Sequence, residues 1–112
     1  MMNYHHKKFK VIHNSENGIV DEEMIFHYVQ IGNILTCDYS GANIRKGQLI
    51  GLVDENGCIN MRYQQINIAD ERMTGTCFST PEKWRNGKIR LHEKWQWTSG
   101  EQTAGTSILE ET

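Results

Sequence analysis

The sequence predicts an all-β protein, an eight-stranded antiparallel up-and-down barrel, from three observations. Apolar and polar residues alternate strictly along 88–97, as a strand with one buried and one solvated face requires. Turn signals such as Asn86-Gly87 recur along the whole chain and divide it into segments of strand length. No segment is clearly a helix long enough to cover a sheet, so the strands must bury their apolar face against one another, which a closed barrel achieves.

Seven turn signals leave eight strands. Because short sequential hairpins favour neighbours along the chain, we prefer a barrel to the alternative, a two-sheet sandwich. Gly47 and Gly51 lie inside one expected strand, where a missing side chain is typical of a bulge or a tight bend. The expected strands are 7–15, 19–31, 34–40, 44–54, 58–69, 72–80, 88–97 and 103–110.

The segment 20–29 also fits an amphipathic helix, with Asp21 as a possible N-cap. Alternation of Phe26, Tyr28 and Gln30 favours a strand, and the short helix is the alternative. The sequence therefore leaves two structures open for this segment.

Pro81 is expected to end the strand 72–80. Ser79 and Glu82 are three residues apart on either side of Thr80-Pro81, a pattern that suits the start of a helix. We therefore predict a single helical turn at 79–82, before the next hairpin.

Composition limits the classes of protein that this chain can be. Its 112 residues fit one domain, 1–112, and 12 Lys and Arg against 14 Asp and Glu give a net charge of −2. That balance gives no electrostatic attraction to nucleic acid or to an anionic membrane, and no apolar run approaches the roughly 20 residues of a membrane span. The sequence predicts a cytoplasmic protein that binds neither nucleic acid nor membrane.

Cysteine and histidine residues form no recognisable ligand pattern. Cys37, Cys58 and Cys77 are odd in number and lack C-x-x-C spacing, which predicts reduced thiols rather than disulfides or a zinc site. The five histidines are far apart in sequence and have no acidic partner at ligand spacing. We expect neither a metal site nor a cofactor.

The phase of each strand assigns its side chains to the two faces of the barrel wall. In 88–97, the apolar side chains Ile89, Leu91, Trp95 and Trp97 share one face, and Glu93 shares it with them. Two environments are open for this carboxyl group. It is either a solvated carboxylate at the mouth of the barrel, paired with Arg or Lys, or a group desolvated beside Trp95, whose proton affinity is then raised as in general acids and ligand-binding carboxyls. By the same phase, Tyr39 of the expected strand 34–40 and Tyr63 and Gln65 of 58–69 point into the barrel. The candidate ligand-binding residues are therefore Tyr39, Tyr63, Gln65, Glu93 and Trp95.

Closure of the barrel would bring the two ends of the chain together. The first and last strands are neighbours in a closed eight-stranded meander. We therefore expect exposed ion pairs between a basic group near the start and an acidic group near the end: Lys7, Lys8 and Lys10 with Glu110 and Glu111.

Three segments carry a resemblance: DENGCINMRY (54–63), MTGTCFSTP (73–81) and NGKIRLHEKWQWTSG (86–100). They resemble a family of short bacterial proteins of unestablished function whose members often carry the label N-acetylglutamate synthase. The resemblance brings no catalytic residue to this chain. The chain contains neither G-x-G-x-x-G nor G-x-x-x-x-G-K-[ST], so no acetyl-CoA site is visible in it. The all-β pattern is also similar to calycin-like barrels, the architecture of lipocalins, fatty-acid-binding proteins and avidin.

Three functional hypotheses follow. The first is a calycin-like barrel that binds a small, largely apolar ligand without transforming it. The second is a small enzyme of the isomerase or hydrolase type that uses Glu93 as acid or base with a Tyr or His. His27 is a candidate partner, but it is in phase with Ile25 and Val29 rather than with Phe26 and Tyr28. The third is an interaction module in which exposed Phe78 or Trp84 forms a homodimer or binds a protein partner.

Overall fold

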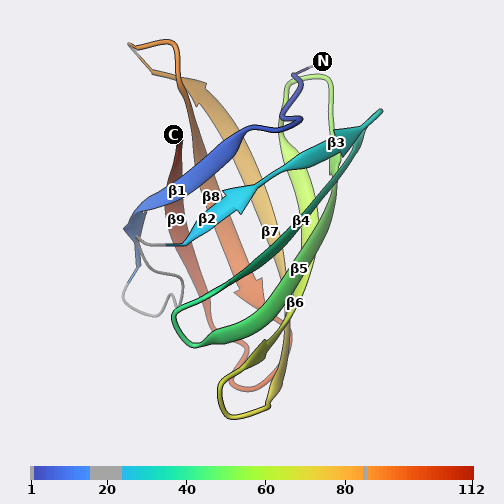
Figure 1. Ribbon diagram of the computed structural model, residues 1–112, viewed down its shortest axis with the longest axis vertical. Helices are drawn as coiled ribbons and strands as arrows, with labels where there is room; N and C mark the ends of the chain where they lie inside the picture. The colour runs from blue at the N-terminus through green and yellow to red at the C-terminus, as the bar shows by residue number, and fades with distance from the viewer. Residues whose placement is uncertain (1, 16–23, 85) are drawn as a thin grey trace.

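Nine antiparallel strands form one continuous sheet in the computed structural model, which describes residues 2–15, 24–84 and 86–112 (Figure 1). The order of the strands across the sheet is β2-β1-β9-β8-β7-β6-β5-β4-β3. The strands are β1 (Lys8–Asn14), β2 (Ile25–His27), β3 (Val29–Ile31), β4 (Ile34–Gly41), β5 (Ile44–Val53), β6 (Ile59–Asn67), β7 (Arg72–Lys83), β8 (Ile89–Trp97) and β9 (Ala104–Glu111).

The sheet nearly closes into a barrel because its two edge strands, β2 and β3, are consecutive in the chain. Only Tyr28 separates them, and Figure 1 shows β2 running on into β3. The Tyr28 N–H donates to the Lys7 carbonyl, and the Tyr28 carbonyl accepts from the His6 N–H, both at 2.9 Å. β2 pairs with β1 and β3 pairs with β4, so this one stretch of chain joins the two sides of a nearly closed barrel.

The predicted fold class is confirmed, with one change in the strand count. The expected strand 19–31 is two short strands within the described residues, and positions 19–23 lie outside them. The alternative helix does not form over 24–29, where Phe26 and Tyr28 are buried and Ile25 and His27 are exposed. That two-residue period is the one that predicted a strand.

The predicted helical turn at 79–82 is wrong, because β7 continues through Pro81 to Lys83. Pro81 lies opposite Leu91 of β8, whereas β6 pairs with β7 only as far as Ser79. Beyond Ser79, therefore, β7 is an edge strand, where a residue without an N–H breaks no ladder bond to β6.

The prediction that Gly47 and Gly51 mark a bulge or a tight bend is wrong for Gly51, which pairs in continuous register with β4 and β6. Gly47, by contrast, borders an irregularity, because the register with β4 shifts between the pairs Gly41–Ile44 and Tyr39–Gly47. The register with β6 shifts between Ile44 and Lys46. A Cβ on Gly47 would overlap the Tyr39 ring, and one on Gly51 would lie 2.9 Å from Met61 Cβ. Both glycines also make room for neighbouring side chains.

The N-terminal segment fills one end of the barrel. Tyr4 is fully buried, its hydroxyl donates to the Gly57 carbonyl at 2.5 Å, and its N–H donates to Gln30 Oε1 at 2.9 Å. Phe9 and Tyr28 pack against the Tyr4 ring. This end of the lumen is therefore packed with side chains.

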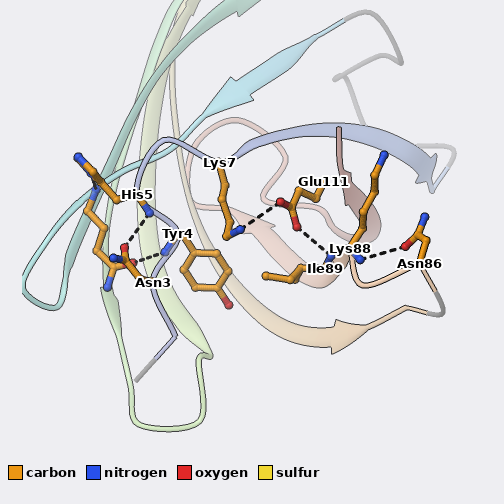
Figure 2. Close-up of polar contacts among 9 residues, drawn as sticks. Asn3, Tyr4, His5, Lys7, Asn86, Lys88, Ile89 and Glu111 are labelled. Carbon is orange, nitrogen blue, oxygen red and sulfur yellow. Dashed lines mark hydrogen bonds and ion pairs between the residues drawn. The ribbon is translucent and has the colours of Figure 1, made fainter.

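β1 and β9 are neighbours, as closure predicted, and an ion pair joins them. Lys7 Nζ lies 3.1 Å from Glu111 Oε2, and Glu111 Oε1 accepts from the Ile89 N–H at 3.1 Å; both contacts are drawn in Figure 2. Glu110 lies opposite Lys10 in the register but pairs with Arg90, at 3.0 Å. Of the predicted exposed ion pairs between the two ends of the chain, the described residues form only Lys7–Glu111, which is partly buried. Arg90 takes the place expected of Lys10.

Within residues 2–15, 24–84 and 86–112 there is no helix long and apolar enough to cross a membrane.

Candidate functional site

A cavity of about 80 Å³ lies in the half of the barrel away from Tyr4. It is placed toward the ends of β1, β4, β6 and β8, and most of its walls are aromatic or aliphatic. Its lining residues are Asn14, Phe26, Tyr28, Tyr39, Leu49, Met61, Tyr63, Gln65, Cys77, Glu93, Trp95, Trp97, Ser107 and Leu109.

Glycines on adjacent strands explain why this half of the lumen is not filled. Tyr39 lies opposite Gly47 in the register, and a Cβ at that glycine would overlap the tyrosine ring. The same relation holds for two further aromatic–glycine pairs, so each ring lies across a glycine on the barrel wall instead of extending into the lumen. These pairs are Tyr63 with Gly75 and Trp95 with Gly105.

The aromatic rings also contact one another. Tyr63 and Trp97 meet edge to face, with ring centroids 5.1 Å apart, and Trp95 and Trp97 do so at 6.3 Å. Such arrangements place the positive edge of one ring against the negative face of another. The walls are therefore held by ring contacts as well as by the strands.

Among the described residues, Glu93 is the only Asp, Glu, Lys or Arg that lines the cavity. Its Oε2 accepts a hydrogen bond from Ser79 Oγ at 2.5 Å, and the Cys77 thiol donates a second one. Burial raises the pKa of Glu93 to about 7, although these two hydrogen bonds oppose the shift. Near neutral pH the carboxyl group is therefore present in both protonation states and can donate or accept a proton.

β8 places Glu93 in the lumen as the phase of the sequence predicted. Its pairing with β7 and with β9 is continuous on both sides of Glu93, so no bulge reverses the direction of the side chain. Ile89, Leu91 and Trp97 on the same face are buried. Turning Glu93 outward would expose these large apolar side chains, at a cost of about 1.5–3 kcal/mol each.

A chain of polar side chains follows the cavity wall across the adjacent strands β8, β9 and β1. Trp95 Nε1 donates to Ser107 Oγ at 2.9 Å, and the Ser107 hydroxyl donates to Asn14 Oδ1 at 2.6 Å. Three strands thus contribute to one hydrogen-bonded chain, which fixes the orientation of the Trp95 ring.

All five of the sequence-predicted ligand-binding residues line the cavity. Tyr39 and Gln65 bond to each other, Oη to Oε1, at 2.9 Å. Their role in binding a ligand stays a prediction. Sequence reasoning did not single out Asn14, Ser107 or Cys77 as site residues, because a small side chain on one strand becomes part of a site only through its cross-strand neighbours.

The inward-facing glycines were the signal that the sequence did offer. Gly47, Gly75 and Gly105 fall in phase with buried residues of their strands, where a strand normally places a side chain. A glycine at such a position indicates that a large side chain from the adjacent strand covers it.

The histidine that was considered as a partner of Glu93 lies outside the barrel. His27 is exposed and its Nε2 lies 3.3 Å from His6 Nδ1, so it does not line the cavity and no His27–Glu93 pair forms. Among the described residues, no group of three or more His, Cys, Asp or Glu side chains could hold a metal ion.

The fold and the cavity define a small, nearly closed antiparallel barrel of the calycin type with a largely apolar cavity near one end. The chain belongs to the avidin-like family, since the family model described as avidin-like protein matches residues 2–112. Comparison with curated proteins and with solved structures gave no match.

Proposed function

We propose that this protein binds a small ligand in the cavity of its barrel and does not transform it. The observation that carries the proposal is the cavity itself, in which aromatic walls surround one carboxyl group and a few polar groups. Ligand sites in proteins have this composition: mostly apolar surface with a small number of placed polar groups. Membership of the avidin-like family supports the same function.

The volume of the cavity limits the size of the ligand. About 80 Å³ corresponds to roughly two or three water molecules in liquid water. A drug-sized molecule needs about 300 Å³ or more. The ligand is therefore either a very small molecule or the head group of a longer one.

Two measurements test the proposal. Native mass spectrometry of the protein as purified from cells should show a bound small molecule, and added ligand should change the fluorescence of Trp95 and Trp97, which line the cavity. Cys77→Met adds bulk beside Glu93 and should abolish both signals. Phe78→Ala, at the neighbouring outward-facing position, is the matched control and should retain them. Binding that survives Cys77→Met unchanged would place the ligand elsewhere.

A second candidate function, self-association, has support from the outer face of the barrel. Exposed aliphatic side chains are adjacent there: Ile31 pairs with Ile34, and Ile34 pairs with Leu52, across β3, β4 and β5. Ile31 is 76% exposed and Leu52 57% exposed. Adjacent exposed aliphatic groups of this kind are typical of protein interfaces.

Of the two residues expected to form such an interface, Phe78 is exposed, whereas Trp84 is half-buried and stacks with the Arg90 guanidinium at 3.7 Å. Sedimentation equilibrium should show a dimer or larger assembly that Leu52→Lys dissociates and Phe78→Lys does not. A wild-type protein that stays monomeric at high concentration excludes this second candidate.

A further inference from the structure

The cavity contains a carboxyl group without a cationic partner. Glu93 accepts hydrogen bonds from Ser79 and Cys77, which are neutral, and within the described residues no Lys, Arg or His lies within ion-pair distance of it. A buried carboxylate without a counter-charge is costly, and pairing with a cation lowers that cost. Glu93 is therefore placed where a positively charged ligand would be stabilised.

The walls of the cavity supply the second requirement of a cation site. Six aromatic side chains line it: Phe26, Tyr28, Tyr39, Tyr63, Trp95 and Trp97. Three of these rings, those of Tyr39, Tyr63 and Trp95, lie against glycines of the wall and border the lumen. The face of an aromatic ring is electron-rich and attracts cations, and groups of such rings are used to bind quaternary and methylated ammonium groups.

The other titratable groups around Glu93 carry no charge that would pair with Glu93 in place of such a cation. They are phenols and thiols: Tyr28 between β2 and β3, Tyr39 and Cys37 of β4, Tyr63 of β6 and Cys77 of β7. Burial raises the pKa of each, so all are neutral across the physiological range. The elements β1, β5 and β9 contribute only uncharged side chains to the cavity.

We propose that the ligand is a small organic ammonium cation, whose methylated head group lies between the ring faces and whose charge pairs with the Glu93 carboxylate. The proposal rests on the proposed ligand-binding function and adds the chemical class of the ligand. A head group of a few non-hydrogen atoms is consistent with the cavity of about 80 Å³.

The affinity for a cationic ligand should depend on pH in one direction. A cation binds the ionised carboxylate, so its affinity must rise as Glu93 loses its proton. With a pKa of about 7, the ionised fraction falls about tenfold between pH 8 and pH 6, and the affinity should fall by the same factor. A neutral ligand that accepts a hydrogen bond from the protonated carboxyl would show the opposite trend.

The test compares two probes of nearly equal shape: choline, a quaternary ammonium, and 3,3-dimethylbutan-1-ol, its neutral carbon counterpart. Calorimetric titration at pH 6, 7 and 8 should show choline at least tenfold tighter than the alcohol at pH 8, with the difference shrinking toward pH 6. Glu93→Gln should remove the preference for choline while leaving binding of the alcohol unchanged or stronger. Trp95→Leu should weaken choline binding, and Phe78→Ala, on the outer face, should not.

Equal affinities for the two probes, or choline binding that Glu93→Gln does not change, would overturn the ammonium assignment. So would the absence of binding by both probes. The native mass spectrometry described above decides independently whether the cavity holds a ligand at all. A neutral or anionic molecule found there would contradict the ammonium class and support the binding function.

Discussion

Glu93 makes the stability of the protein depend on pH. In the unfolded chain its carboxyl group loses the proton near the ordinary value of 4.5, but in the fold burial keeps the proton until about pH 7. Between these pH values the folded state binds more protons than the unfolded state, so the free energy of unfolding falls as the pH rises. The loss is complete above about pH 7 and amounts to roughly 3 kcal/mol.

Glu93→Gln should therefore stabilise the protein at high pH. Glutamine can still accept the Ser79 hydrogen bond but carries no charge to bury. We expect the free energy of unfolding of the variant, relative to wild type, to rise by up to about 3 kcal/mol between pH 5 and pH 8. Urea unfolding at several pH values measures this, with Glu101→Gln, at an exposed loop position, as the control. Parallel pH profiles for wild type and Glu93→Gln would contradict the burial of the charge.

Gly75→Ala tests the contact between an aromatic ring and a glycine. The added methyl group would overlap the Tyr63 ring, so the ring must move, and we expect a loss of about 1–3 kcal/mol in the free energy of unfolding. In a Tyr63→Ala background the same substitution should cost far less, because the ring is absent. A double-mutant cycle measured by urea unfolding separates the two terms. Equal costs in both backgrounds would show that the ring is not the cause.

At the scale of the elements, closure of the barrel depends on two features. β1 pairs with β9, and the consecutive short strands β2 and β3 pair with β1 and β4, respectively. Lys7 and Glu111 join the first and last parts of the chain at a partly exposed position. An ion pair of this kind contributes little energy, at most about 1 kcal/mol, and salt screens it. We expect its main effect to be on the alignment of β1 with β9.

Lys7→Met should lower the free energy of unfolding by about 0.5–1 kcal/mol at low salt, and the difference should shrink in 1 M NaCl because screening weakens the ion pair in the wild type. Lys8→Met removes an equal charge one residue away, at an exposed position, and serves as the matched control. Thermal unfolding followed by circular dichroism at both salt concentrations provides the comparison. A salt-independent loss in Lys7→Met would point to packing of its aliphatic chain instead.

At the scale of the whole molecule, the two ends of the barrel are different. Tyr4 fills one end, where its ring is fully buried and its hydroxyl is bonded to Gly57, while the cavity lies in the other half. Figure 2 shows Tyr4 on the same side of the molecule as the Lys7–Glu111 pair. The N-terminal segment is thus part of the core, although its described residues 2–7 form no strand.

Two substitutions at Tyr4 should have graded effects. Tyr4→Phe removes one hydrogen bond and should cost about 1 kcal/mol, whereas Tyr4→Ala also leaves a void and should cost about 3–5 kcal/mol. Urea unfolding monitored by circular dichroism measures both. A Tyr4→Ala variant no less stable than Tyr4→Phe would mean that the ring does not fill that end of the barrel.

The pattern of the sequence was sufficient to predict the all-β barrel, the adjacency of its first and last strands and the inward direction of Glu93. Each of these depends on local alternation and on turn residues, which are properties of short stretches of chain. The helical turn expected at 79–82 does not form, and β7 continues to Lys83 instead. Pro81 fits in this strand because β6 ends opposite Ser79, so the missing N–H breaks no hydrogen bond to β6. The extent of a neighbouring strand is not a property of the local sequence.

What the sequence alone determined is therefore the period of each strand, and with it which side chains can enter the lumen. Only the tertiary structure decided which of those side chains meet. It places Tyr63 over Gly75 and joins Trp95, Ser107 and Asn14 in one hydrogen-bonded chain. It also leaves Glu93 without a cationic partner among the described residues. The physical reason is that alternation fixes the direction of a side chain, whereas contacts depend on the register between strands that are distant in sequence.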